Sequence, residues 1–158
     1  MCSRHYEHMI FQKRSFPGCG RMSEVINGCE AFSWLSVYNE TSEICLLDRV
    51  RNCTSFVCRL RGLTFKRSLS RDEGLLLVGS RESRVDSAIH MFFVFFSIAV
   101  VWLDRELTVV DVQLARPFAP VYIPCARAQS VLEGPPRIMD QVSIGDKLRF
   151  EGYPRVAK

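Results

Sequence analysis

The sequence lacks the short motifs that mark the common catalytic and cofactor-binding sites. It has no glycine-rich phosphate loop, no Gly-x-Ser-x-Gly turn for a nucleophile and no His-Glu-x-x-His zinc motif. Its cysteines include no Cys-x-x-Cys pair, and the only histidine beyond residue 8 is His90. These absences exclude the best-known catalytic signatures, and we expect no cofactor.

The cysteine count is odd, at seven, which is atypical of a secreted disulfide framework. The first twenty residues also lack an apolar stretch of the length found in signal peptides. We therefore expect a cytoplasmic protein in which most cysteines act as small buried apolar groups. Cys2, His5, His8 and Cys19 have spacing compatible with zinc, but they lie in an irregular segment, so a solvated tail is favoured and no metal site is predicted.

The domain organisation predicted from composition is one globular domain with two loose ends. Residues 1–32 show no periodicity and are expected to form a poorly ordered leader, and Met22 is an alternative start of translation. A single β-rich domain is expected at 33–152, followed by a tail at 153–158. Apolar residues make up 47% of the chain, which is enough for a sizeable core.

The net charge of +4 is mild, and arginine outnumbers lysine by seventeen to four. A basic stretch, Arg49 to Arg71, could follow a phosphate backbone. It lacks the interleaved aromatic residues of a single-strand binder, so a solvated surface explains it equally well and nucleic acid is not favoured as a partner.

The longest uncharged run, Ala88 to Leu103, has sixteen residues and is shorter than the twenty or so that a membrane-spanning helix needs. It is rich in aromatic and β-branched residues, which favour strands. We therefore predict no membrane span but two strands, at 88–95 and 98–103, each covered on both faces.

Other strands are predicted where apolar runs end at glycine, proline or polar residues, at 33–38, 42–50, 73–79, 107–115, 129–134 and 144–152. Residues 81–87 read as a polar loop, and three prolines predict an extended loop around Tyr122. The fold class is therefore mainly β (α+β), a compact antiparallel β-barrel or sandwich of about eight strands with one short helix packed on it.

The helix is predicted within residues 54–69, with Thr54 or Ser55 as its N-cap. Apolar residues at helical spacing form one face, namely Phe56, Leu60 and Leu63. Arg59 lies beside this face and is expected to be half-buried with a carboxylate partner, whereas Arg61 points away from it.

Seven phrases in order resemble the prokaryotic family named domain of unknown function 192: RLRGL from Arg59, EGLLLV from Glu73, IHMFFVFF from Ile89, VVWLD from Val100, ARPFAPVY from Ala115, VLE from Val131 and IGDKL from Ile144. The resemblance covers residues 37–151 and implies a compact β-rich domain with a helix after the second strand, but no activity. Relatives carry Pro and then Ile-Asp where this chain has Ser97 to Ala99, and a glycine where it has Arg137.

The ligand-binding candidates are Arg59, His90, Asp104, Tyr122 and Glu133. In the functional interpretation Arg59 binds an anion between carboxylates in a cleft near the helix. In the structural alternative Arg59 forms an ion pair, His90 is a core residue and Asp104 holds a turn.

Three functions follow from these candidates. The main hypothesis is a small soluble domain that binds a small polar or anionic ligand, or a segment of a partner protein, and is not an enzyme. The alternative is a hydrolase or lyase that uses His90 and Glu133 within hydrogen-bond reach of each other. The third is weak nucleic-acid binding through an Arg-rich helix. The residues predict neither the identity of the ligand nor an oligomeric state.

Overall fold

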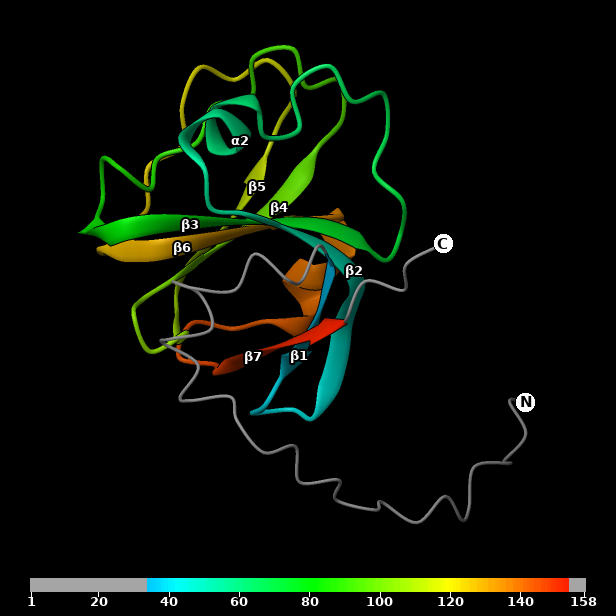
Figure 1. The fold of residues 1–158 in the computed structure, drawn as a ribbon, viewed down its shortest axis with the longest axis vertical. Helices are drawn as coiled ribbons and strands as arrows, with labels where there is room; N and C mark the ends of the chain where they lie inside the picture. The colour runs from blue at the N-terminus through cyan, green and yellow to red at the C-terminus, as the bar shows by residue number, and fades with distance from the viewer. Residues whose placement is uncertain (1–33, 154–158) are drawn as a thin grey trace.

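The computed structural model describes residues 34–153 of the chain (Figure 1). The elements follow one another as β1 (Trp34–Asn39), β2 (Ile44–Cys53), α2 (Phe56–Arg61), β3 (Glu73–Ser83), β4 (Ile98–Leu103), β5 (Val109–Ala115), β6 (Ala128–Gly134), the 3-10 helix η1 (Pro136–Gln141) and β7 (Leu148–Tyr153). The predicted mainly β fold with a short helix is confirmed. No helix in this described part is both long and apolar enough to span a bilayer.

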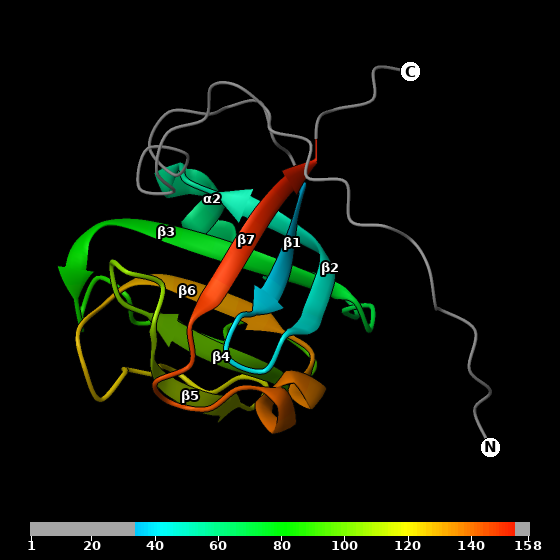
Figure 2. The same cartoon turned by 90° about the horizontal axis from the view of Figure 1, so that it is seen from below.

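The seven strands form one curled sheet in the order β5-β4-β6-β3-β2-β1-β7. All neighbouring strands are antiparallel except β2 and β3, which are joined by the crossover through α2. The curl brings the two edges together, since the Val109 amide donates to the Asp146 carbonyl at 2.8 Å. The result is a half-barrel, in which β1 and β7 lie opposite β4 and β5 (Figure 2).

The central strands are covered on both faces, as their continuous apolar sequences predict. In β4, Ala99, Val101 and Leu103 pack inside the half-barrel, in one hydrophobic cluster. The alternate residues of the same strand pack outside it in a second cluster, beneath α2 and the loops: Ile98, Val100 and Trp102. All six side chains of β4 are buried. The outer cluster forms the floor on which a site can be built.

The strand predicted at 88–95 is wrong. Residues 88–97 form a loop over the outer cluster, which makes a single β-bridge between Ile89 and Tyr122. A tight turn between Met91 and Val94 breaks the alternation of a strand: both residues are buried, while Phe92 and Phe93 between them are exposed. Aromatic composition suggested a strand here, but the apolar positions lack the period of two that pairing requires.

Other boundaries also differ from the prediction. The helix is shorter than the segment 54–69, because Gly62 ends it with a positive φ of 45°. Strand β3 continues to Ser83 and takes in part of the predicted 81–87 loop. The 3-10 helix η1 was not predicted, and it begins directly after a proline, where a helical turn can start without an amide donor.

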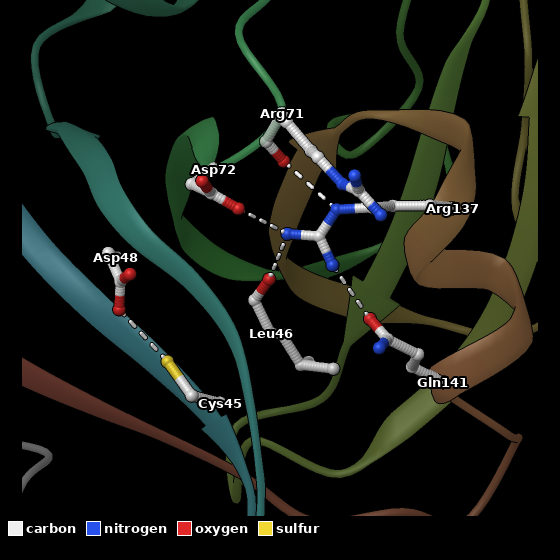
Figure 3. A network of polar contacts seen from close by, with 7 residues as sticks. All are labelled: Cys45, Leu46, Asp48, Arg71, Asp72, Arg137 and Gln141. Atoms are coloured by element: carbon white, nitrogen blue, oxygen red, sulfur yellow. Dashed lines mark hydrogen bonds and ion pairs between the residues drawn. The ribbon is translucent and has the colours of Figure 1, made fainter. Parts of the chain in front are cut away.

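Arg137 links η1 to the start of β2 and to the segment before β3 (Figure 3). Its guanidinium donates to the carbonyls of Leu46 at 2.9 Å and Arg71 at 3.0 Å, to the Gln141 side chain at 3.0 Å and to the Asp72 carboxylate at 2.8 Å. Because η1 follows β6 after a single residue, this network also fixes the C-terminal end of β6.

Candidate functional site

The helix α2 is short and held at both ends. The Ser55 hydroxyl accepts a hydrogen bond from the Cys58 amide at 3.3 Å, which confirms it as the N-cap. At the other end the Gly62 amide donates to the Cys58 carbonyl at 2.9 Å. A disulfide between Cys53 and Cys58 joins the end of β2 to the helix. These contacts fix α2, the helix that carries Arg59, above β3 and β6 (Figure 1).

The prediction that most cysteines act as small buried apolar thiols is wrong for the described residues. Cys53 and Cys58 form the disulfide, and Cys45 and Cys125 are exposed thiols. Burial and the neighbouring Asp48 carboxylate raise the pKa of the Cys45 thiol to about 11, so it carries little thiolate at neutral pH. Cys45 is therefore a poor nucleophile. It lies near the start of β2 and contacts Asp48 (Figure 3), whereas α2 follows the other end of that strand.

A cavity of about 640 Å³ lies between α2, the sheet and the loop 88–97. This volume is within the usual range for sites that bind small molecules. Its apolar wall comes from the turn after α2, from the loop and from β3, β4 and β6, with Leu63, Leu77, Met91, Val94, Ile98 and Val131. Its polar groups include Arg59 from α2, His90 from the loop, and Gln129 and Glu133 from β6.

Four residues that line this cavity each carry a buried polar atom that has no hydrogen-bond partner among residues 34–153. These atoms are Arg59 Nε, His90 Nδ1, Gln129 Oε1 and Glu133 Oε2. Leaving a buried donor or acceptor unpaired costs about 1–3 kcal/mol, and native proteins rarely do so without a reason. The four side chains are therefore the candidates for binding a group that enters the cavity.

Glu133 is the most perturbed acid that lines the cavity. The residue is only 5% exposed. Burial penalises its charged form and raises the pKa of its carboxyl from 4.5 to about 7. Near neutral pH the side chain is therefore present both as a carboxylic acid, which donates a hydrogen bond, and as a carboxylate, which accepts one.

Two backbone features adjoin these groups. The Gln129 amide nitrogen donates to the Gly79 carbonyl at 3.3 Å, whereas its Oε1 has no partner among the described residues. A methyl group added at Gly62 would lie 3.9 Å from Glu133 Oε2, which is an ordinary contact distance. The positive φ of Gly62, and not a lack of space, is therefore the reason for glycine at the end of the helix.

Three of the five predicted ligand-binding residues line this cavity together. Arg59 and His90 are 31 residues apart in the sequence and His90 and Glu133 are 43 apart, and the fold brings all three to one cavity. Arg59 is half-buried, as expected, but the carboxylate partner predicted for it is absent among the ion pairs of residues 34–153. Its charge instead acts over a longer distance, and contributes to lowering the pKa of Asp86 after the larger effect of Arg81.

The other two predicted residues lie outside the cavity. The Asp104 carboxylate accepts from the Thr108 amide at 2.8 Å and holds the turn between β4 and β5. The Tyr122 hydroxyl accepts from the Arg116 amide at 2.8 Å, and its backbone pairs with Ile89. Both contacts are structural, and the second fixes the loop 88–97 that carries His90.

Gln129 is the cavity residue that sequence reasoning missed. It lies in β6, where it reads as the polar residue at the start of an apolar strand, and no local pattern distinguishes it from a solvated one. Asp86 was likewise read as part of a polar loop, although it lines the cavity mouth with its partner Arg81, at 2.6 Å.

No cluster of three or more metal-ligating side chains is found in the described part of the chain. The cysteines and histidines with zinc-like spacing lie in the first nineteen residues, outside that part. The Arg-rich helix proposed for nucleic acid is also smaller than expected: Arg61 ends α2, and Arg67 and Arg71 lie in the segment after it, all three exposed.

The sequence profile of the domain of unknown function 192, described as an uncharacterized ACR family, matches residues 39–150. Among curated proteins, the UPF0127 protein PH1112 of Pyrococcus horikoshii is 34% identical over 116 residues, which cover 72% of this chain and 97% of that protein. The UPF0127 protein PYRAB11210 of Pyrococcus abyssi is 33% identical over 116 residues, which cover 72% of this chain and 96% of its own length.

Two crystal structures share the fold. One, from Sinorhizobium meliloti 1021 and proposed to be a transcription regulator, has a TM-score of 0.65 and 18% identity, and covers 78% of this chain and 98% of its own. The other, a protein of unknown function from Novosphingobium aromaticivorans, has a TM-score of 0.63 and 13% identity, and covers 84% and 99%. At these identities the likeness concerns the fold alone.

Proposed function

Since the chain belongs to the family of the domain of unknown function 192, we propose that its domain binds a small polar or anionic ligand in the cavity between α2 and the sheet. The observation that carries this proposal is that four residues lining one cavity each have a buried polar atom without a partner in the described part of the chain. A structural role for these side chains would pair them with one another or with the backbone.

The arrangement suits a ligand with an anionic group and an apolar body. Arg59 Nε–H is a donor in a partly buried position, where its attraction to an anion is stronger than in bulk water. A protonated Glu133 adds a second donor in the same cavity, while Gln129 Oε1 would accept from an N–H or O–H of the ligand. The apolar wall favours carbon substituents on the far side of the anionic group. A small carboxylic acid that also carries a hydroxyl or amide group meets all these demands.

An enzyme of the hydrolase or lyase type is the second candidate, and one observation favours it. Glu133 has a pKa near 7, the range in which a general acid or base works best, and it shares its cavity with His90. However, no hydrogen bond between the two side chains is found in the described part of the chain, and Nδ1 of His90 and Oε2 of Glu133 both lack a partner there. A binding site is therefore the better supported function.

Thermal-shift measurements with matched pairs of compounds test the binding proposal. Each carboxylate is compared with its uncharged amide, using the wild-type chain, Arg59→Gln and the control Arg105→Gln, which removes an exposed arginine in the turn after β4. A ligand at a hundred times its dissociation constant stabilises the folded state by about 3 kcal/mol. We expect some carboxylates to raise the melting temperature of the wild type and of Arg105→Gln, but not of Arg59→Gln.

Two results would contradict the proposal: no compound shifts the melting temperature, or the shifts are the same in Arg59→Gln. The enzyme alternative is tested on the same compounds. Mass spectrometry after prolonged incubation detects conversion of a bound compound, and conversion that stops in His90→Gln favours the enzyme. A ligand that is bound and recovered unchanged supports a binding domain.

Expected partners and location follow from the same interpretation. The cavity is sized for a small molecule, although a side chain of a partner segment could enter it with the same contacts. A cytoplasmic location was expected from the sequence and is kept as a proposal. Disulfides such as Cys53–Cys58 are rare in a reducing compartment, so the redox state of this pair in cells is the direct test of that location.

A further inference from the structure

Five exposed phenylalanines lie on three loops, and these loops lie at the α2 end of the sheet (Figure 1). Their side chains are exposed by 49–67%, which is unusual for so many large aromatic rings in one region. They come from the turn after α2, the loop 88–97 and the loop after β5, and we call them the aromatic rim: Phe65, Phe92, Phe93, Phe95 and Phe118.

The rings of the aromatic rim contact one another across the loops. Phe65 stacks on Phe93 with ring centroids 5.1 Å apart, and Phe95 meets Phe118 edge to face at 5.4 Å. These pairs link all three loops, so the apolar surface is continuous and is not a set of scattered exposed side chains.

The backbone holds the aromatic rim in place. Phe65, Phe93 and Phe118 have positive φ angles of 62°, 57° and 60°, a region that bulky side chains seldom adopt. Hydrogen bonds between the loops fix this conformation: the Phe65 amide donates to the Phe93 carbonyl at 3.0 Å, and the Phe118 amide donates to the Met91 carbonyl at 3.2 Å. A strained backbone that persists in this way and presents an aromatic ring to solvent is a sign of a functional surface.

The charges of the same loops are of one sign. Segments 59–71, 88–97 and 116–127 contain no aspartate or glutamate. Their exposed arginines are Arg61, Arg67, Arg71, Arg116 and Arg127. Lys66 is the one basic residue of these segments with a described ion pair, to Glu73 at 2.6 Å. The loops that carry the aromatic rim are therefore basic.

We propose that the aromatic rim docks on the surface of a lipid bilayer that contains anionic lipids. The phenylalanine rings would enter the boundary between head groups and acyl chains, while the arginines bind lipid phosphates. A bilayer fits this surface better than a protein partner, because the aromatic side chains project from loop tips and no acidic residue is offered for a specific ion pair. This inference is independent of the ligand-binding function, although the loop 88–97 serves both the aromatic rim and the cavity.

Vesicle flotation of the full chain tests the proposal. The vesicles are pure phosphatidylcholine, or phosphatidylcholine with about 30% phosphatidylglycerol. Phe92→Ser/Phe95→Ser removes two rings whose φ angles are ordinary and whose side chains do not line the cavity. Arg116→Gln/Arg127→Gln removes two charges. The matched control is Ile144→Ser/Arg105→Gln, at the opposite end of β4, where Ile144 is 68% exposed.

The expected results differ between the variants. The wild type and the control bind anionic vesicles and hardly bind neutral ones. The Phe92→Ser/Phe95→Ser variant binds at least about tenfold more weakly, because the aromatic surface that would be buried in the bilayer is lost. The Arg116→Gln/Arg127→Gln variant binds about 25-fold more weakly, since each basic residue near an anionic surface contributes about a fivefold factor. Circular dichroism and melting curves establish that each variant is folded.

Three outcomes would overturn the proposal. The folded wild-type chain could bind neither kind of vesicle, or Phe92→Ser/Phe95→Ser could bind anionic vesicles as well as the wild type does. The third outcome is a wild type that binds no vesicles but forms a dimer in light scattering, which Phe92→Ser/Phe95→Ser dissociates. The last result would assign the aromatic rim to a second copy of the chain. Thermal shifts by carboxylates can fail or succeed without affecting any of these readouts.

Discussion

Replacing Glu133 with glutamine should change how the stability of the protein depends on pH. The side chain is 5% exposed, and burial raises its pKa from 4.5 to about 7. Glutamine has nearly the same shape but carries no charge at any pH. The substitution therefore isolates the cost of ionising one buried carboxyl, with little change in packing.

The magnitude follows from the difference in proton affinity between the folded and unfolded states. A tenfold change in proton affinity is worth about 1.4 kcal/mol, so the shift of Glu133 corresponds to about 3 kcal/mol. The sign is that of an acid whose pKa is raised by folding. Its stabilising effect is complete below pH 4.5, declines as the unfolded chain ionises, and is lost once the pH exceeds about 7.

Urea denaturation between pH 5 and pH 8.5 measures this effect. At pH 5 the wild type and Glu133→Gln should have similar free energies of unfolding. At pH 8.5 the glutamine variant should be more stable by about 3 kcal/mol, or about 10 °C in melting temperature. Glu106→Gln, at an exposed position in the turn after β4, serves as the control and should follow the wild type.

A free-energy difference between wild type and Glu133→Gln that stays constant across this range would refute the reasoning. So would a carboxyl carbon resonance of Glu133 that titrates near pH 4.5. The same pKa links stability to function, because binding of an anion beside Glu133 requires its protonated form. Affinity for a carboxylate should therefore fall above pH 7 in the wild type and vary less in Glu133→Gln.

Two further predictions concern residues that hold the fold around the site. Arg137→Ala should lower the free energy of unfolding by about 2–3 kcal/mol in urea titrations. Arg137→Lys should recover only part of this loss, because an ammonium group cannot reproduce the four contacts of the guanidinium. Equal stability of the lysine variant and the wild type would contradict this prediction. Burial alone would raise the pKa of Asp111, but hydrogen bonds from the Cys125 amide and from Gln113 outweigh it and lower that pKa below 3.8. Asp111→Asn should therefore speed hydrogen exchange at the Cys125 amide. Its free energy of unfolding should be lower than that of the wild type above pH 3.8, and this difference should shrink as the pH falls through the lowered pKa. An unchanged exchange rate would contradict the prediction.

Much of the fold could be predicted from local patterns. The residues of β4 form an uninterrupted apolar run, which correctly predicts a strand covered on both faces. The Ser55 cap and the half-buried position of Arg59 follow from the sequence of the helix. The segment 88–95 was predicted wrongly, because its phenylalanines favour a strand, whereas a tight turn between Met91 and Val94 exposes the two rings between them.

The candidate site was predictable only in part. Arg59, His90 and Glu133 drew attention as polar groups among apolar residues, and all three line the cavity. Asp104 drew attention for the same reason but binds within its own turn. Gln129 gave no signal at all, because a glutamine at the start of a strand is ordinary in any sheet.

The sequence by itself determined which segments are buried, where most strands and the helix lie, and to which family the chain belongs. Those properties depend on the nearest neighbours along the chain, and on the period of the apolar residues. Only the tertiary structure decided which polar atoms are left without a partner and that they face one cavity. Whether a buried group is paired depends on every side chain within about 3 Å of it, and those side chains come from segments far apart in the sequence.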